Sequence, residues 1–189
     1  MNSSALAEPP AATWRRILKG AIRDSDRLCD LLELPDSFRV GARIAAEKFG
    51  LVAPLPFVRR IRKGDPNDPL LRQILPVIEE TEVREGYSID PLLEIASPND
   101  TGLIQKYHGR VLLIAAHACA VNCRYCFRRH FPYEETPRSL VEFEPALQTI
   151  GNDESITEVI LSGGDPLART DDWLAGRTRS GFCGTSRSK

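Results

Sequence analysis

The chain of 189 residues is 42% hydrophobic and 27% charged, a composition typical of a globular protein with one core or slightly more. Its formal net charge of −1 gives no electrostatic case for a nucleic acid or a membrane surface, so neither is expected as a partner. No apolar run reaches the roughly 18 residues of a membrane-spanning helix, and the N-terminus lacks the features of a signal peptide. We therefore expect a cytoplasmic protein whose five cysteines are kept reduced.

The first hundred residues predict a mobile N-terminus, residues 1–12, and then a helical region, residues 13–100. Thr13 and Ser25 are each followed by apolar residues at helical spacing, so both are expected to cap helices. A third helix is expected over residues 40–49, because a glycine that can end it follows directly.

The rest of this region contains fewer long helical patterns. Residues 54–76 are dense in proline and charge, which predicts short helices joined by a turn. Residues 79–94 are acidic and broken by glycine and proline, and we expect irregular chain that wraps the following domain. Cys29 lies on an apolar helix face and is expected to be a buried hydrophobic side chain, not a ligand.

Strand and helix patterns alternate over residues 101–175, which predicts parallel βα units. Strands are expected at residues 111–116 and 158–162, with a helix over residues 141–150 between them. Residues 176–189 contain few apolar side chains, so this tail is expected to be disordered.

Three cysteines, Cys119, Cys123 and Cys126, follow the first predicted strand with the spacing C-x3-C-x2-C. Active sites in α/β folds lie at such strand ends. Thiolates bind soft metals and iron–sulfur clusters. Because a cubane cluster has four irons, three cysteines leave one iron open to a substrate or cofactor.

Structural zinc is the alternative for these thiols. Cys123, Cys126 and His130 read as C-x2-C-x3-H, and Cys119 could complete a tetrahedral site. The cluster is favoured on spacing, and we expect His117 and His130 to be packing or hydrogen-bonding residues. Cys183, in the tail, is expected to be a stray thiol.

A second candidate site lies at the end of the second predicted strand, at Gly163, Gly164 and Asp165. Glycines at a strand end let a ligand approach the backbone and expose amide groups, and a carboxylate beside them suits an ammonium group. The alternative is an ordinary turn between a strand and a helix.

Together these motifs resemble the radical S-adenosylmethionine superfamily, with Tyr125 as the aromatic residue before the last cysteine. Over residues 14–174 the chain resembles the lysine 2,3-aminomutase family, most closely the branch that acts on a lysine of elongation factor P. The segments that carry this resemblance are GDPNDPLLRQILP, KYHGRVLLI, CAVNCRYCFRRHFPY and LSGGDPL.

The resemblance implies an α/β fold in which a small helical region precedes the N-terminal half of a partial (β/α) barrel. It implies a 4Fe–4S cluster, S-adenosylmethionine and pyridoxal 5′-phosphate as cofactors. The expected cluster ligands are Cys119, Cys123 and Cys126, and the residues expected near S-adenosylmethionine are Tyr125, Gly163, Gly164 and Asp165.

The implied reaction moves the α-amino group of lysine to the β-carbon, with electrons from a low-potential donor. The substrate is a lysyl group of elongation factor P or, alternatively, free lysine. Arg128 matches the position that binds the substrate carboxylate, and its alternative is a surface arginine. Tyr107 and Arg110, and more loosely Lys106, match positions near pyridoxal phosphate, and their alternative is a solvated loop.

The resemblance also sets a limit. The family's lysine that binds pyridoxal phosphate covalently lies beyond the matching segment, and no lysine of this chain stands in that context. Too few residues follow Gly102 for a barrel of about 250 residues, so we expect a truncated or frame-shifted chain that does not rearrange lysine. A non-catalytic metal- or cluster-binding module, or an inactive fragment, is the alternative of another class. The sequence gives no oligomeric state.

Overall fold

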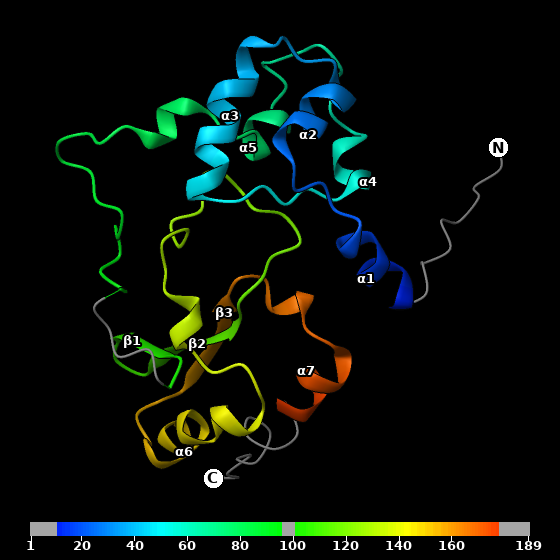
Figure 1. Cartoon of the computed structure of the whole chain (residues 1–189). Coiled ribbons are helices and arrows are strands. Elements are labelled where there is room, and N and C mark those ends of the chain that lie inside the picture. Colours follow the sequence, from blue (N-terminus) through cyan, green and yellow to red (C-terminus); the bar gives the residue numbers. More distant parts are fainter. Residues whose placement is uncertain (1–10, 96–100, 178–189) are drawn as a thin grey trace, which may run out of the picture. The chain divides into compact units, whose positions relative to one another are not determined.

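The computed structural model describes residues 11–95 and 101–177 (Figure 1). Most of the expected mobile N-terminus and of the expected disordered tail lies outside these ranges. The chain forms two compact units. The helical unit comprises residues 1–85 with 120–126, and the sheet unit comprises residues 86–119 with 127–189.

The described helices of the helical unit are mostly short. They are α1 (Ala11–Lys19), α2 (Ser25–Leu32), α3 (Ser37–Lys48), α4 (Leu55–Val58), α5 (Leu71–Ile74) and the 3₁₀ helix η1 (Ile78–Thr81). The three expected N-terminal helices are therefore confirmed, although α1 begins at Ala11, so Thr13 lies inside it and is not its cap, and α3 begins three residues earlier than the sequence predicts. The proline-rich stretch forms single helical turns, as expected of chain that lacks backbone donors at its prolines.

The start of α2 differs from the prediction. Asp24, not Ser25, is the N-cap, and its side chain accepts a hydrogen bond of 2.7 Å from the amide of Arg27. Ser25 is instead the first helical residue and is buried. The helix ends where Glu33 takes a left-handed conformation with φ 54°, two residues before Pro35.

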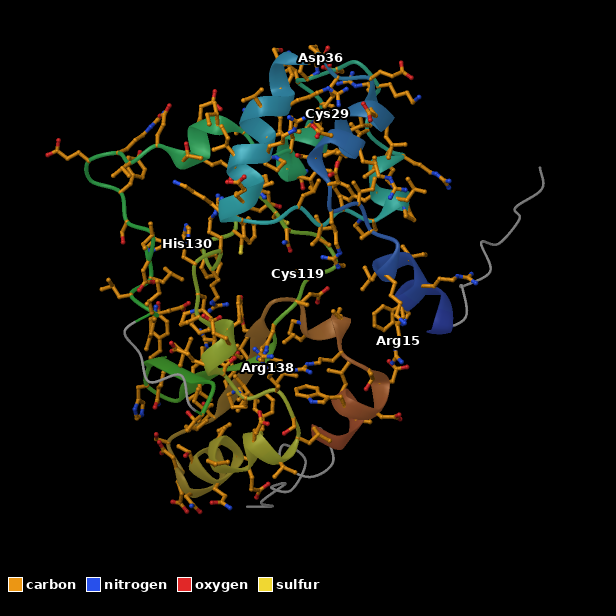
Figure 2. The ribbon with its side chains drawn as sticks, in the orientation of Figure 1. Arg15, Cys29, Asp36, Cys119, His130 and Arg138 are labelled. Carbon is orange, nitrogen blue, oxygen red and sulfur yellow. The ribbon has the colours of Figure 1, made fainter. Side chains whose placement is uncertain are left out.

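Cys29 lies in the core of the helical unit and is fully buried, as the sequence predicts (Figure 2). Burial raises the pKa of its thiol, because an apolar environment disfavours the charged thiolate. The side chain therefore acts as a small hydrophobic group. It packs with Ile22, Leu28, Leu32, Leu51, Leu71, Ile74 and other apolar residues.

Asp68 fixes the turn before α5. Its carboxylate accepts hydrogen bonds from the amides of Leu70, Leu71 and Arg62 and from the Arg62 guanidinium. Burial alone would raise the pKa of this carboxyl, but the hydrogen bonds outweigh burial and hold the pKa below its usual value. The acidic residue of the turn is thus a structural acceptor.

Among its described residues, the sheet unit has three strands in the order β1 (Leu103–Tyr107), β2 (Arg110–Ala116) and β3 (Glu158–Gly163), shown in Figure 1. β2 and β3 are the two expected strands, and they pair in parallel as predicted. β1 pairs with β2 in the antiparallel direction and was not predicted. The protein is a mixed α/β structure.

The sheet buries apolar side chains on both faces. Leu113 and Ala115 of β2 pack with Phe143, Ala146 and Trp173, which come from η3 (Val141–Phe143), α6 (Glu144–Asn152) and α7 (Asp171–Arg177). The opposite face carries a second cluster, made by Ile104, Ile114 and Phe131 with Leu112 and Tyr133. Since β2 is covered on both sides, it reads as one continuous apolar run.

The expected helix over residues 141–150 is present as η3 followed by α6, whose first turn contains Pro145. α7 was not predicted, and the further short 3₁₀ helices are η2 (Tyr133–Glu135) and η4 (Pro166–Ala168). Among the described residues, no helix combines the length and the apolar character that crossing a membrane would require.

The first prediction concerns the core of the sheet unit. Phe143 is fully buried and packs edge to face on Trp173, with ring centroids 5.7 Å apart. Phe143→Ala should lower the free energy of unfolding by about 3–5 kcal/mol, because it removes buried surface and leaves a cavity. Val141→Ala, on the same 3₁₀ helix but 82% exposed, should change it by less than about 0.5 kcal/mol. Urea unfolding followed by tryptophan fluorescence measures both, and equal effects would contradict this packing.

The second prediction concerns Asp68 and pH. A carboxyl whose pKa is lowered on folding stabilises the protein above its unfolded pKa, and this contribution is lost as the pH falls through the folded pKa. Asp68→Asn should therefore lower the thermal midpoint at pH 7, and the difference from wild type should shrink below a pH of about 3.9. Asp36→Asn, whose side chain is 92% exposed, serves as the control. A difference independent of pH would rule out the charge as the cause.

Candidate functional site

The residues with expected chemistry follow the carboxyl ends of β2 and β3. His117 comes directly after β2, and its Nε2 lies 2.8 Å from the Oγ1 of Thr136. Burial lowers the pKa of His117, and the positive charges of Arg169 and Arg138 lower it further. His117 is thus a hydrogen-bonded side chain, as expected, while His130 is exposed. Figure 2 labels Cys119 and His130, which lie on the loop that follows β2.

The cysteine loop, residues 117–133, belongs to both units. Cys119 falls in the sheet unit, whereas Cys123 and Cys126 fall in the helical unit. All three are half-buried thiols outside any disulfide, and the amide of Cys126 donates a 3.0 Å hydrogen bond to the carbonyl of Cys123. Within the described ranges, no group of three or more histidine, cysteine or acidic side chains is arranged to hold a metal ion. The donor chemistry of three reduced thiols fits a soft metal or an iron–sulfur cluster.

Residues 120–126 are held in the helical unit by backbone hydrogen bonds. The amide of Asn122 donates to the carbonyl of Val52 at 3.0 Å, and the amide of Arg124 donates to that of Gln73 at 2.8 Å. The Asn122 side chain reaches the carbonyl of Gly50 at 2.9 Å, while Val121 packs against the helical core. These contacts fix the backbone on both sides of Cys123.

Tyr125, expected near S-adenosylmethionine, is 70% exposed. A hydrogen bond with Cys123, and the charge of that thiol when it is ionised, raise the pKa of the Tyr125 phenol. The phenol therefore lies beside one of the candidate metal-binding thiols.

The two glycines of the GGD motif allow close approach of two backbone segments. Gly163 has φ +110°, and a Cβ there would lie 2.3 Å from the carbonyl oxygen of Ala116. A Cβ on Gly164 would lie 2.4 Å from the carbonyl oxygen of Ala118. Both positions therefore require glycine for steric reasons.

The amides of this motif have partners within the protein. The amide of Gly164 donates a 2.7 Å hydrogen bond to the carbonyl of Ala116, and the amide of Asp165 donates a 2.9 Å hydrogen bond to the carbonyl of Ala118. The sequence suggested that these glycines expose amide groups to a ligand. In the structure the amides of Gly164 and Asp165 instead extend the pairing of the two strands, because the chain after β2 runs on beside the chain after β3.

The Asp165 carboxylate is the group of this motif that can receive an ammonium ion. Its Oδ1 caps η4 by accepting a 2.9 Å hydrogen bond from the amide of Leu167. Among the described residues, no hydrogen bond reaches the second oxygen, Oδ2. The side chain is half-buried.

Arg128 is neither a surface arginine nor a side chain open to solvent. It is buried, and its Nε and Nη2 donate to the two carboxylate oxygens of Glu94 at 2.7 and 3.1 Å. Its Nη1 donates to the hydroxyl of Ser162 at 2.7 Å. These two partners use three of the five N–H donors of the guanidinium.

Lys106 joins the same buried group, since its Nζ lies 3.4 Å from Glu94. The structure thus brings Lys106 and Arg128 together through Glu94, a residue that the sequence interpretation placed in wrapping chain without a role. No sequence pattern identifies Glu94, because its role follows from the burial of Arg128, which needs a carboxylate partner.

Tyr107 and Arg110 lie at the other end of the sheet. Tyr107 ends β1, and Arg110 begins β2, where it forms an ion pair with Glu158 at the start of β3. At about 3.3 Å per residue, the length of β2 puts Arg110 roughly 20 Å from the end that bears the GGD motif. A pocket of about 300 Å³ lies here, lined by residues 107–110, 157 and 158. The described structure does not bring these two residues to the cysteine loop.

The comparisons with known proteins agree with the motifs. No family model matches the chain. The L-lysine 2,3-aminomutase of Haemophilus influenzae is 44% identical over 86% of this chain and 48% of its own length. The L-lysine 2,3-aminomutase of Escherichia coli is 42% identical over 89% of this chain and 50% of its own length. The chain thus spans about half the length of these curated relatives.

A more distant relative carries the same name. The L-lysine 2,3-aminomutase of Clostridium subterminale is 28% identical over 85% of this chain and 39% of its own length. Most of the chain aligns with each of the three relatives, and the expected resemblance to lysine 2,3-aminomutases is confirmed. Over most of its length, the chain is therefore similar to about half of the length of proteins named L-lysine 2,3-aminomutase.

Proposed function

We propose that this chain is the cluster- and S-adenosylmethionine-binding part of a radical lysine aminomutase, an isomerase that moves the α-amino group of lysine to the β-carbon. The observation that carries the proposal is the set of reduced, half-buried thiols of Cys119, Cys123 and Cys126 on the loop after a buried strand. Structural zinc would use the same thiols, and metal analysis separates the two.

The fit to a 4Fe–4S cluster rests on the donor set. Cys119, Cys123 and Cys126 would be its three ligands, which leaves one iron without a protein ligand. The backbone hydrogen bonds of residues 120–126 support the proposal, because metal sites need ligands whose positions are fixed by their surroundings.

The proposed site for S-adenosylmethionine includes Tyr125 and the GGD turn. Asp165 would receive the methionyl ammonium on its Oδ2, while Gly163 and Gly164 keep the turn close to the start of the cysteine loop. When bound, the cluster and S-adenosylmethionine supply the radical that removes hydrogen from the substrate. The residues of this chain orient those groups and exclude water.

The proposed substrate is a lysyl group of elongation factor P, with free lysine as the alternative. Arg128 is the proposed partner of the substrate carboxylate, since one N–H on each Nη is not used by Glu94 or Ser162. We place the reaction in the cytoplasm, with a low-potential electron donor and reduced thiols.

Pyridoxal 5′-phosphate is proposed as a cofactor of the longer family proteins. Tyr107 and Arg110 remain the candidates of this chain for it, but their place at the far end of β2 gives no support for a shared site with the cysteine loop. We therefore derive no step through this cofactor.

The proposed architecture is the first part of a partial (β/α) barrel. In such barrels helices cover the outer face of a parallel sheet and functional side chains gather at the carboxyl ends of the strands. The helices α6 and α7 cover one face here, while Arg128 and Ser162 meet at the carboxyl end of β3. This arrangement supports the proposal.

The third prediction tests the cluster. Anaerobic reconstitution of the chain with iron and sulfide should give a broad absorption band at about 400 nm, typical of iron–sulfur thiolate bonds. Cys119→Ala, Cys123→Ala and Cys126→Ala should each abolish it, while Cys29→Ala should retain it because that thiol lies in the core. Zinc with no iron in anaerobically purified protein, or iron that survives the loss of Cys123, would contradict the assignment.

The fourth prediction tests Asp165. Reduced, reconstituted protein should cleave S-adenosylmethionine to methionine and 5′-deoxyadenosine. Asp165→Asn keeps an oxygen that can cap η4 but removes the charge, and it should slow cleavage about tenfold or more, because charge-assisted hydrogen bonds contribute about 1.5–3 kcal/mol. Asp165→Ala should be at least as slow. If Asp165→Asn cleaves at the wild-type rate and only Asp165→Ala is slow, Asp165 acts through the cap alone.

A further inference from the structure

We propose that Arg124 is a positioning residue that sets the geometry of the Cys123–Cys126 turn through its ion pair with Glu80. This inference rests on the proposed function, in which these thiols hold a cluster. It assigns the helical unit a specific task, which is to hold the two thiols in place before the cluster binds.

The contacts of Arg124 use several sides of its guanidinium. Nε and Nη2 donate to the two carboxylate oxygens of Glu80 at 2.9 and 2.7 Å, and Nη1 donates to the carbonyl of Phe49 at 2.8 Å. The guanidinium also lies 4.9 Å from the centroid of the Phe49 ring. The side chains of Arg124 and Glu80 are only 6% and 11% exposed. A planar, bidentate and nearly buried arrangement of this kind is specific to arginine.

Glu80 is itself held in place. Its Oε1 accepts a 3.1 Å hydrogen bond from the amide of Val77, which caps the N-terminus of η1. At Gly41, α3 approaches η1 so closely that a Cβ would lie 3.1 Å from the Cβ of Ile78. The carboxylate that receives Arg124 therefore belongs to a short helix packed directly on α3.

These contacts matter for the thiols because Arg124 lies between Cys123 and Cys126 in the sequence. It directly follows Cys123 and precedes Cys126 by two residues, and its own amide donates to the carbonyl of Gln73. Backbone and side chain of one residue are thus both anchored between two candidate ligands. Outer-shell residues that orient metal ligands typically change metal affinity by about 10- to 100-fold when they are replaced.

The test uses Arg124→Lys and Glu80→Gln in the 189-residue chain. Lysine keeps the charge but cannot form the bidentate pair, and glutamine keeps the shape but removes the charge. Arg43→Lys is the matched control, because Arg43 forms an ion pair with Asp26 in the same unit but is 59% exposed. After anaerobic reconstitution, a chelator should remove iron about 10- to 100-fold faster from the two test variants than from wild type or Arg43→Lys.

A second readout uses the metal-free chain. Alkylation of each thiol is followed by mass spectrometry of peptides, and Cys123 and Cys126 should react at a rate different from wild type in both test variants. Cys119, in the sheet unit, and Cys29, fully buried in the helical core, should keep their wild-type rates.

The outcomes separate the possibilities. If wild type binds no iron, the proposed function fails, while the alkylation rates still test the positioning of the turn. If both variants match Arg43→Lys in iron loss and in alkylation, the positioning role is wrong. If Cys29 becomes reactive together with Cys123 in both variants, the ion pair stabilises the whole unit and not the turn, which also overturns the inference.

Discussion

The backbone contact between residues 116–118 and residues 163–165 is the constraint on which the candidate site depends. Each amide hydrogen bond there joins the chain after β2 to the chain after β3, at 2.7 and 2.9 Å. The approach is so close that a Cβ on Gly163 or Gly164 would lie within 2.4 Å of a carbonyl oxygen. The pairing therefore continues up to the residue before Cys119, and it fixes where the first thiol and the GGD carboxylate leave the sheet.

Buried charges are the second constraint. Arg124 and Arg128 are both nearly inaccessible to solvent, and a buried guanidinium without a partner would be costly. Each has a bidentate carboxylate, Glu80 for the first and Glu94 for the second. Because removal of either carboxylate would leave an unpaired buried charge, these acidic residues are as important to the local structure as the arginines.

The sequence predicted the parts of the structure that follow from local patterns. β2 and β3 could be predicted because each is a short apolar run, and their parallel pairing followed from the helical segment between them. β1 was not predicted, because the burial of its side chains does not alternate along the strand and only Ile104 is fully buried. The cap of α2 was placed one residue late because both Asp24 and Ser25 are good capping residues and only the geometry decides between them.

The candidate site was predictable in its chemistry but not in its contacts. Cysteine spacing and the GGD motif identified where the chemistry lies, since they depend on residue types close in the sequence. The pairing of Arg128 with Glu94 joins residues 34 positions apart, and that of Arg124 with Glu80 joins residues 44 positions apart. No local pattern encodes such contacts, and for Arg128 the sequence offered only a ligand-binding or a surface role.

The acidic segment, residues 79–94, explains how one short loop can be held in both units. The boundary between the units falls after residue 85, so Glu80 belongs to the helical unit and Glu94 to the sheet unit. The cysteine loop changes unit in the same way, after residues 119 and 126. In the helical unit the loop supplies Arg124 and the acidic segment supplies Glu80. In the sheet unit the loop supplies Arg128 and the acidic segment supplies Glu94. The stretch that looked like featureless charged chain in the sequence therefore contributes an anchor to each part of the cysteine loop, and each anchor can be altered without removing a thiol.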